Sequence, residues 1–439
     1  MSVNFVFWIV QKVFFPATAD EKLAKRSLIS SLSYLYPEED KQKRFLGFIE
    51  LKQLIQAKKH TFIPRLNAKG VVLDRAQRKK QPRIDYLIAL GYKEEELFFL
   101  SKNDIRCYKA ILPIWERLQI YAFGFFIASK IVFNENNRVN WTLLIRIVLE
   151  LSILKRLLSH SGPLEWHDFV QYDIDSNLIY LFLKELKGGQ ITYIKYPSPG
   201  PLALHNRLLL TDVLVVNHGY HLDELKYFAE SIKFSKVVIR PPEGFFSYQE
   251  NYANVQYCDN DSIGYYSHAA WLRKLQGHTD DGLDILAAEE TVLMKLADFV
   301  TKNPQMKLVL FLHPREKSLK YADKTHLYYR RFFGDNFEIA TVNSSEGFNL
   351  VKLGIGVYST ILFERLVCGY PTLIFSPADS FPIKDSVLDE IILNTENFER
   401  LTTKYIRMES KKFFDEPGIV TMVEDRFKAR VDANPSTTK

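Results

Sequence analysis

The sequence predicts an α/β protein with two Rossmann-like domains that face a cleft, preceded by an extra helical N-terminal region. The chain has 439 residues, which is too long for one ordinary core. From about residue 166, short apolar strands alternate with amphipathic helices, the pattern of a parallel sheet with right-handed crossovers. This alternation occurs in two blocks, separated by an irregular, Tyr-rich stretch at 241–285.

These changes of pattern set the expected domains. Residues 1–163 are predicted to be mostly helical, because 143–158 place apolar side chains on one helix face. An N-terminal Rossmann-like domain is expected at 164–285 and a C-terminal one at 286–425. The polar end of the chain, 426–439, is expected to be a flexible tail.

Each block contains the expected elements in alternation. In the first block the strands are 168–173, 191–196, 212–217 and 236–240, with helices at 176–186 and 222–232. Gly188 and Gly189 end the first of these helices. In the second block the strands are 307–312, 337–341, 354–358 and 372–375, with helices at 288–302, 315–333, 345–351 and 361–368.

Composition excludes several classes of protein. The 58 basic and 52 acidic residues give a net charge of +6, which is too small an excess to argue for nucleic acid. The three cysteines, Cys107, Cys258 and Cys368, have no metal-site spacing and fit a reducing cytoplasm. The chain contains no G-x-S-x-G elbow, no Walker A sequence and no G-x-G-x-x-G after a strand.

Two apolar runs raise the question of a membrane. The first fifteen residues lack a basic start and a cleavage site, so a signal peptide is not expected. The run 118–133 contains Lys130, and both runs are too short to span a bilayer. They are either buried helices or interfacial anchors, and burial is expected for the second. A basic cluster is either a solvated loop or a contact with an anionic lipid or polymer: Arg75, Arg78, Lys79, Lys80 and Arg83.

The strongest candidate site follows the apolar run 308–312, which has the composition of a central parallel strand. His313 comes directly after it, where a neutral imidazole can hydrogen-bond a phosphate or act as an acid. Pro314 fixes the turn, and Arg315 offers a guanidinium suited to phosphate or carboxylate. A purely structural His-Pro turn is the alternative.

The second half of this site is a strand, 354–358, followed by two hydroxyl residues and a helix. A helix N-terminus presents backbone N–H groups to an anion, and Ser359 and Thr360 add hydroxyl donors. Either hydroxyl can instead serve only as a helix cap. Glu364, one turn into the helix, contacts ribose hydroxyls or stays solvated.

The string FERLVCGYPTLIF at 363–375 resembles the helix–Gly–x–Pro–strand signature of GT-B glycosyltransferases. Together with His313-Pro314 and Ser359-Thr360, it is similar to bacterial sialyltransferases, polysialyltransferases and capsule Kdo transferases. The resemblance covers about residues 305–376, and Thr360 stands where a Ser is common. It implies a nucleotide and donor site that binds CMP-sugar without a metal, formed by His313, Pro314, Arg315, Tyr358, Ser359, Thr360 and Glu364.

The resemblance also implies an acceptor site in the first block. Asp173 or Asp175, at a predicted strand end, is expected to be the base that takes the acceptor hydroxyl proton. Asp175 can alternatively cap the following helix. The loops after the next strands supply the expected acceptor-binding residues Ser198, His205, Asn217 and His218.

The residues and the resemblance together predict a cytoplasmic glycosyltransferase with a peripheral contact on the inner face of the membrane. We expect it to move an acidic sugar, such as sialic acid or Kdo, from CMP to a glycan or glycolipid acceptor of capsule or lipopolysaccharide. Three alternatives remain: a polyol-phosphate transferase that uses a CDP-alditol, a non-hydrolysing sugar-nucleotide epimerase, and a non-catalytic scaffold of polysaccharide assembly.

Overall fold

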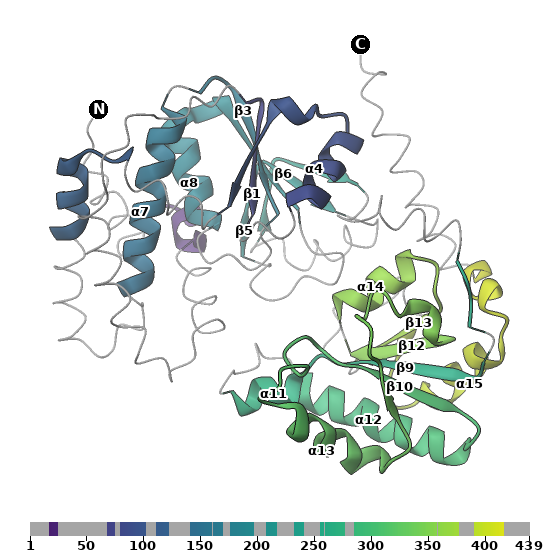
Figure 1. Cartoon of the computed structure of the whole chain (residues 1–439). Helices are drawn as coiled ribbons and strands as arrows, with labels where there is room; N and C mark the ends of the chain where they lie inside the picture. The colour runs from purple at the N-terminus through teal and green to yellow at the C-terminus, as the bar shows by residue number, and fades with distance from the viewer. Residues whose placement is uncertain are drawn as a thin grey trace. The chain divides into compact units, whose positions relative to one another are not determined.

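The computed structural model contains two α/β units, each built on a six-stranded parallel sheet (Figure 1). The structure describes residues 17–24, 68–74, 80–101, 111–122, 141–159, 161–169, 176–196, 208–216, 232–240, 255–258, 260–276, 285–357, 359–376 and 390–416. Described residues through 215, and 232–238, belong to the first unit, and those from 239 onward to the second. Two Rossmann-like units are therefore confirmed, and the expected cleft between them stays a prediction.

The first sheet has the strand order β2-β1-β3-β4-β6-β8. Its strands are β1 Gly70–Asp74, β2 Leu97–Ser101, β3 Leu164–Asp168, β4 Ile191–Lys195, β6 Val213–Val216 and β8 Lys236–Ile239. Helices whose bounds lie within the described residues of this unit are α4 Lys80–Ala89, η3 Glu94–Glu96, α7 Trp141–Leu158, α8 Ser176–Lys187 and η5 Gly188–Gln190. A small separate sheet pairs β5 Leu209–Leu210 with β7 Ile232–Lys233.

Part of the region that was expected to be helical belongs to this sheet. β1 and β2 lie within 1–163 and pair in parallel with each other, and β1 also pairs with β3. The prediction of an extra N-terminal helical region is therefore wrong at these strands. Five-residue apolar runs such as GVVLD and LFFLS carry too little periodicity to separate strand from helix. The strand expected at 168–173 is also displaced, because β3 ends at Asp168.

The described parts of the basic cluster and the second apolar run differ from expectation. Lys80 is exposed, but Arg83 is buried, with its guanidinium 5.1 Å from the Phe169 ring centroid. In the helical turns at 114–122, Trp115 is 67% exposed and Leu118 44% exposed, although Ile120 is buried. Within the described residues, no helix is long and apolar enough to cross a bilayer.

The second sheet has the strand order β11-β10-β9-β12-β13-β14. Its strands are β9 Ser262–Tyr266, β10 Lys307–Phe311, β11 Glu338–Ile339, β12 Leu353–Val357, β13 Thr372–Phe375 and β14 Ile392–Leu393. Its helices are α11 Ala270–Leu275, α12 Ile285–Lys302, α13 Ala322–Phe333, η7 Phe348–Leu350, α14 Thr360–Val367, α15 Phe398–Arg407 and η8 Ser410–Asp415. Numbered in chain order, this is 3-2-1-4-5-6, the order of dinucleotide-binding Rossmann domains.

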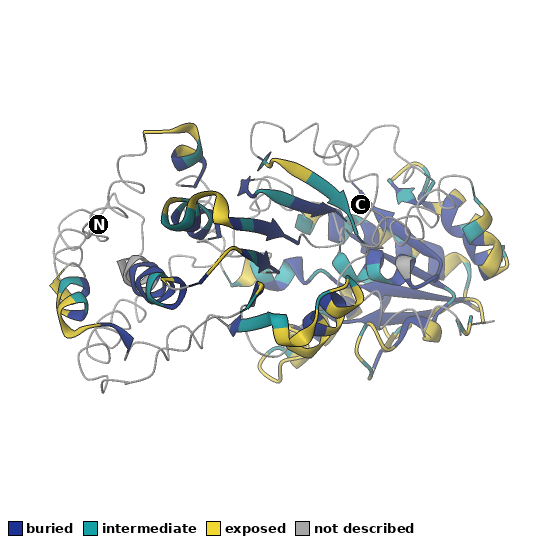
Figure 2. Cartoon of the chain, turned by 90° about the horizontal axis from the view of Figure 1, so that it is seen from above, coloured by how far each residue is buried: buried dark blue, intermediate teal, exposed yellow. Residues whose placement is uncertain are grey.

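Helices cover both faces of the second sheet. α14 lies on one face and contacts β12 and β13, whereas α12 and α13 lie together on the other face (Figure 1). The strands between these layers are mostly buried, and exposed residues concentrate on the outer helix faces (Figure 2). This burial on both faces explains the nearly continuous apolar runs of β10 and β13.

The first strand of the second unit lies where an irregular stretch was expected. β9 and α11 fall within 241–285, so the boundary expected at 285 lies inside the second unit. β9 has the sequence SIGYY, in which aromatic residues take the place of the usual Val and Ile. The helix expected at 315–333 begins later, because residues 314–320 form turns and α13 starts at Ala322.

Two glycines of β12 are required by packing. A Cβ on Gly354 would lie 2.5 Å from Nε of Arg365, and one on Gly356 would lie 2.6 Å from the backbone oxygen of Tyr266. The side chain of Arg365 is fully buried and donates to backbone oxygens of Phe348, Val351 and Pro371. These glycines therefore let a buried guanidinium and the neighbouring strand approach β12.

We expect Gly356→Ala to lower the free energy of unfolding of the second unit by about 1–3 kcal/mol, because the new methyl group meets rigid backbone. Gly189→Ala is the control, since no atom lies within 4 Å of the added Cβ there. Urea denaturation followed by circular dichroism measures both. Equal midpoints for the two variants would contradict the close approach of β9 and β12.

Candidate functional site

The loops that carry the predicted donor residues leave the same edge of the second sheet. Tyr266, the last residue of β9, pairs with Phe311 of β10 on one side and Gly356 of β12 on the other. The order of the strands reverses between β9 and β12, and ligands of open α/β sheets bind outside such a switch point. His313 and Ser359 therefore follow the two strands that flank β9.

His313 lies directly after β10 and is half-buried. Its Nδ1 accepts a hydrogen bond of 3.2 Å from the Arg315 backbone N–H, so the neutral ring carries its proton on Nε2. Burial, reinforced by the charges of Arg273 and Arg315, lowers the pKa of His313 to about 4. At neutral pH the imidazole is therefore an uncharged Nε2–H donor.

His268 is a second imidazole at this edge, and it was not predicted from the sequence. It follows β9 by two residues, and its Nδ1 is buried without a hydrogen-bond partner among the described residues. Burial lowers the pKa of His268 well below its usual value, and Arg273, His313 and Arg315 add to this. The same two guanidinium charges act on both rings, so Arg273 of α11 and Arg315 lie near the imidazoles that follow β9 and β10, and we refer to these four side chains as one cluster.

The charge of this cluster favours an anionic ligand. Arg273, in the last turn of α11, and Arg315, in the turn after β10, keep their charge at every physiological pH. Burial is the main cause that keeps the two imidazoles neutral, and the charges of Arg273 and Arg315 add to it. An anion beside them would reverse that effect and favour the protonated rings.

The backbone amides of the loop after β9 point into the protein. The carboxylate of Glu289 accepts from the N–H groups of His268 and Ala270, at 3.0 and 2.8 Å, and Ser267 Oγ accepts from Ala269 N–H at 3.0 Å. Ala269 consequently adopts φ 56°, a left-handed conformation that is uncommon for a residue with a side chain. The side chains of this loop, and not these amides, are left to meet a ligand.

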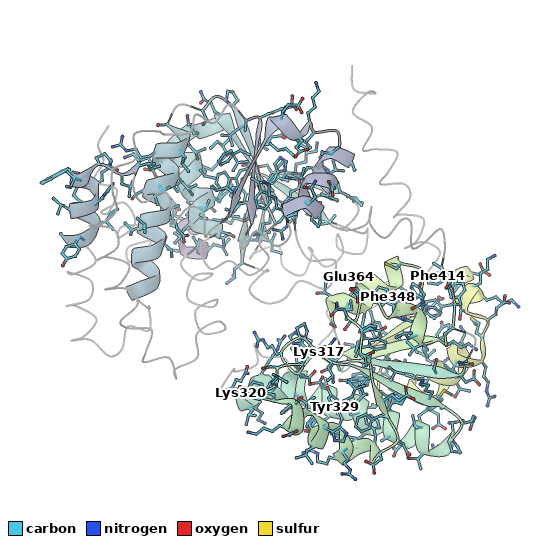
Figure 3. The ribbon with its side chains drawn as sticks, viewed as in Figure 1. Lys317, Lys320, Tyr329, Phe348, Glu364 and Phe414 are labelled. Atoms are coloured by element: carbon cyan, nitrogen blue, oxygen red, sulfur yellow. The ribbon has the colours of Figure 1, made fainter. Side chains whose placement is uncertain are left out.

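The loop after β12 retains the features of the predicted phosphate site. Ser359 has the extended backbone of a helix cap, but its side chain makes no capping hydrogen bond to α14. The cap-only explanation is therefore not supported for this hydroxyl. Thr360 opens α14, and the half-buried Glu364 lies one turn further along it. Figure 3 shows Glu364 and Lys317 on the same side of the second unit.

Neighbouring residues of the FERLVCGYP string have a structural role. Arg365 also donates to the Tyr266 hydroxyl at 3.1 Å, and its guanidinium lies 5.1 Å from the Tyr370 ring centroid. Arg365 thus ties α14 to β9 and to the turn before β13. This part of the signature builds the support beneath the candidate site.

In the first unit, a buried ion pair lies at the ends of β3 and β4. Lys195 Nζ is 2.8 Å from Asp168 Oδ2 and 3.2 Å from Ser176 Oγ, and Tyr193 donates its hydroxyl proton to the same carboxylate. Asp168 and Lys195 are 0% and 5% exposed. This pair was not predicted from the sequence, because the strand was expected to end at 173.

Several predicted site residues lie outside the described residues. They are both candidate bases, Asp173 and Asp175; the acceptor-binding residues Ser198, His205, Asn217 and His218; and Tyr358 of the donor site. Their roles stay predictions. Within the described ranges, no group of three or more His, Cys, Asp or Glu side chains is arranged to hold a metal ion.

Solved structures share a distant likeness with the chain. An O-GlcNAc transferase from Thermobaculum terrenum is 10% identical, with a TM-score of 0.43, and the match covers 96% of this chain and 77% of that one. A UDP-GlcNAc 2-epimerase from Neisseria meningitidis, solved with UDP-GlcNAc, is 11% identical, with a TM-score of 0.48 and coverage of 83% and 98%. A trehalose-phosphate synthase (UDP-forming) from Burkholderia vietnamiensis is 10% identical, with a TM-score of 0.47 and coverage of 83% and 95%. No protein-family model and no curated protein matches the sequence.

The lowered pKa of His313 predicts how stability depends on pH. The unfolded pKa is about 6.5 and the folded pKa is about 4, so the unfolded chain binds this proton more readily. The free energy of unfolding should therefore fall as the pH decreases from about 6.5 to about 4. His313→Asn removes this contribution and should flatten the curve relative to the unchanged protein.

Urea denaturation at a series of pH values measures the effect. His326→Asn is the control, because His326 is exposed on α13 in the same unit. Parallel curves for the wild type and His313→Asn between pH 4 and 6.5 would contradict a neutral, buried imidazole.

Proposed function

We propose that the protein is a glycosyltransferase that binds the phosphates of a nucleotide-activated sugar at the carboxyl edge of its second sheet. The observation that carries the proposal is the cluster of His268, Arg273, His313 and Arg315 beside the switch point. Both guanidinium groups are permanent cations, and the imidazole of His313 offers a donor proton. α14, with the Ser359 hydroxyl at its start, supplies further donors after β12, the strand on the other side of β9 from β10.

The charges favour a donor with two phosphate groups. A nucleoside diphosphate sugar carries two negative charges on adjacent phosphates between nucleoside and sugar, whereas in a CMP-linked acidic sugar the second charge belongs to the carboxylate of the sugar. Arg273, on the helix after β9, and Arg315, in the turn after the neighbouring strand β10, provide two cations for two such charges. We therefore propose a nucleoside diphosphate sugar as the donor, in preference to the CMP-sugar that the sequence resemblance implied.

In the proposed reaction, these groups stabilise the leaving nucleotide. Negative charge develops on the phosphate as the glycosidic bond to the donor breaks, and preorganised donors lower the energy of that charge. His313 Nε2–H donates a hydrogen bond to this phosphate, and Arg273 and Arg315 offset its charge. A base from the first unit, for which Asp173 and Asp175 remain the candidates, takes the proton of the acceptor hydroxyl. This arrangement requires no metal ion.

A glycan or glycolipid is proposed as the acceptor, with a peripheral membrane contact that brings a lipid-linked acceptor to the protein. The support for this contact is the apolar surface at 114–122, where Ile114 and Trp115 are 73% and 67% exposed. Aromatic and aliphatic side chains of this kind insert at the boundary between headgroups and acyl chains. The capsule or lipopolysaccharide setting rests on the sequence resemblance alone.

Other activities predict different products at the same site. An epimerase would convert one sugar nucleotide into another without releasing nucleotide. A polyol-phosphate transferase would consume a CDP-alditol and release CMP. A scaffold would bind no nucleotide. Incubation with sugar nucleotides and an acceptor, followed by chromatography of the nucleotides, distinguishes these outcomes.

We expect a nucleoside diphosphate to raise the melting temperature of the protein more than its monophosphate does. A ligand at about a hundred times its dissociation constant adds about 2.7 kcal/mol to the free energy of unfolding. A thermal-shift screen with UDP, GDP, ADP, CDP and their monophosphates, CMP included, measures this. A larger shift with CMP than with any diphosphate would favour the CMP-sugar donor, and no shift with any nucleotide would favour the scaffold.

We expect His313→Ala and Ser359→Ala to lower donor turnover about a hundredfold, the usual effect of removing one donor to a developing anion. Arg273→Met should weaken nucleotide binding as well, because it removes a permanent charge. Ser345→Ala and Arg330→Met are matched controls at exposed positions of the same unit. If His313→Ala and Ser359→Ala both turn over normally, this assignment of the site is wrong.

A further inference from the structure

Two buried carboxylates lie beneath the loops that carry the two histidines. Glu289, on α12, is 0% exposed, and Glu316, in the turn after β10, is 1% exposed. Neither forms an ion pair with another described residue. A buried, unpaired carboxylate is costly unless hydrogen bonds satisfy it, so the contacts that these two groups make identify what they hold in place.

Glu289 holds the loop after β9. Its Oε1 accepts from the Tyr265 hydroxyl at 2.8 Å and from the His268 N–H at 3.0 Å, and its Oε2 accepts from the Ala270 N–H at 2.8 Å. The hydrogen bonds from these two backbone N–H groups fix the loop on both sides of Ala269, the residue with φ 56°. The direction in which the His268 side chain leaves the backbone is therefore fixed by Glu289.

Glu316 holds the loop after β10 in the same manner. Its Oε2 accepts from the His313 N–H at 2.9 Å. Its Oε1 accepts from Trp271 Nε1–H at 2.6 Å and from the Tyr329 hydroxyl at 2.9 Å. One oxygen thus fixes the backbone of His313, while the other fixes α11 and α13 to the same carboxylate.

A hydroxyl bridge joins the two carboxylates. Tyr329 Oη lies 2.7 Å from Ser267 Oγ, which is 3.4 Å from Glu289 Oε1. Tyr329 is fully buried on α13, among the residues that support the sheet edge (Figure 3). The two loops therefore meet through a chain of buried polar groups, Glu289–Ser267–Tyr329–Glu316, in which the two hydroxyl protons fill two of the three links at a time when both carboxyl groups are ionised.

We propose that Glu289 and Glu316 are positioning residues of the anion site, which set the relative orientation of His268 and His313 without touching the ligand. This inference rests on the proposed function for the identity of the ligand. The physical reason is preorganisation: the loops that carry His268 and His313 need a fixed frame if their side chains are to meet a ligand in one orientation. The two carboxylates fix the loops from the inner side. The backbone N–H dipoles directed at the carboxylates offset the negative charge of these groups.

Glutamine substitution tests this frame at both positions. In Glu289→Gln, the amide oxygen can keep the bonds of Oε1, which leaves the NH2 group facing the Ala270 N–H. In Glu316→Gln, the oxygen can keep the Trp271 and Tyr329 bonds, which leaves the NH2 group facing the His313 N–H. Each substitution therefore places two hydrogen-bond donors face to face at the loop. The other hydrogen bonds of the replaced carboxylate can remain.

The control is Tyr265→Phe. It removes one hydrogen bond to Glu289 from inside the strand and leaves both bonds to the loop intact. A network that matters only for stability would respond to Tyr265→Phe much as it responds to Glu289→Gln. If Glu289 has a positioning role, Glu289→Gln weakens ligand binding much more than Tyr265→Phe does.

Calorimetric titration of the whole protein with inorganic pyrophosphate gives the first readout. We expect Glu289→Gln and Glu316→Gln to weaken binding about tenfold, the effect of losing an orienting partner, and Tyr265→Phe to change it less than about twofold. The second readout is the titration of the His268 and His313 rings by NMR without ligand. It should change in both glutamine variants and stay unchanged in Tyr265→Phe.

Wild-type affinity and ring titration in folded Glu289→Gln and Glu316→Gln would overturn the positioning role. Equal losses in Tyr265→Phe would overturn it too. If the glutamine variants do not fold, Ser267→Ala removes the bridge and the contact to Ala269 N–H, and an unchanged His268 titration in it would likewise overturn the role. If the wild type binds neither pyrophosphate nor any nucleotide, the proposed function fails, and the ring titrations still decide the positioning role.

Discussion

The parallel pairing of β9 with both β10 and β12 is the constraint on which the candidate site depends. Tyr266 stands opposite Phe311 on one side and opposite Gly356 on the other, so three loops leave the sheet side by side. If β9 ran antiparallel, its loop would leave the opposite edge and His268 would be far from His313. The glycine at 356 permits this pairing, since any side chain there would meet the carbonyl of Tyr266.

The crowding of these loops creates an electrostatic problem that the interior of the unit resolves. Two guanidinium groups and two imidazoles share one edge, and each added charge makes the next less favourable. The rings remain neutral, chiefly because they are buried and additionally because of these charges. Beneath them, Glu289 and Glu316 supply acceptors for the inward-facing amides, and burial together with Glu316 raises the pKa of Glu289. The cations lie at the edge and the carboxylates lie beneath its loops, so the positive side of this arrangement faces an incoming anion.

The sequence predicted the alternation of strands and helices in the second block and the strand ends that carry His313 and Ser359. Long apolar runs such as that of β10 explain this success, because burial on both faces leaves a clear signal. β9 was missed because SIGYY is short and aromatic, and His268 was missed with it. β1 and β2 were missed for the same reason of length.

The role of Glu289 could not be predicted from sequence. It occupies a polar position in an amphipathic helix, a pattern that normally indicates a solvent-exposed side chain. Its burial follows only from the packing of α12 beneath β9, and the acceptors it provides are used by residues about twenty positions away. Arg365 illustrates the same limit. The sequence favoured its neighbour Glu364 as a ligand contact, while tertiary packing made Arg365 the support of the edge.

Departures from the usual backbone and hydrogen-bond preferences are concentrated at this edge, which argues for a functional origin. Ala269 adopts a left-handed backbone, Ser359 leaves α14 without a side-chain cap, and His268 Nδ1 is buried without a described partner. A missing cap alone costs about 1 kcal/mol. Glycine at 269 would remove the first of these departures, because glycine adopts a left-handed backbone without steric cost. Proteins keep such local costs where the strained groups bind or react, and here all three surround the end of β9.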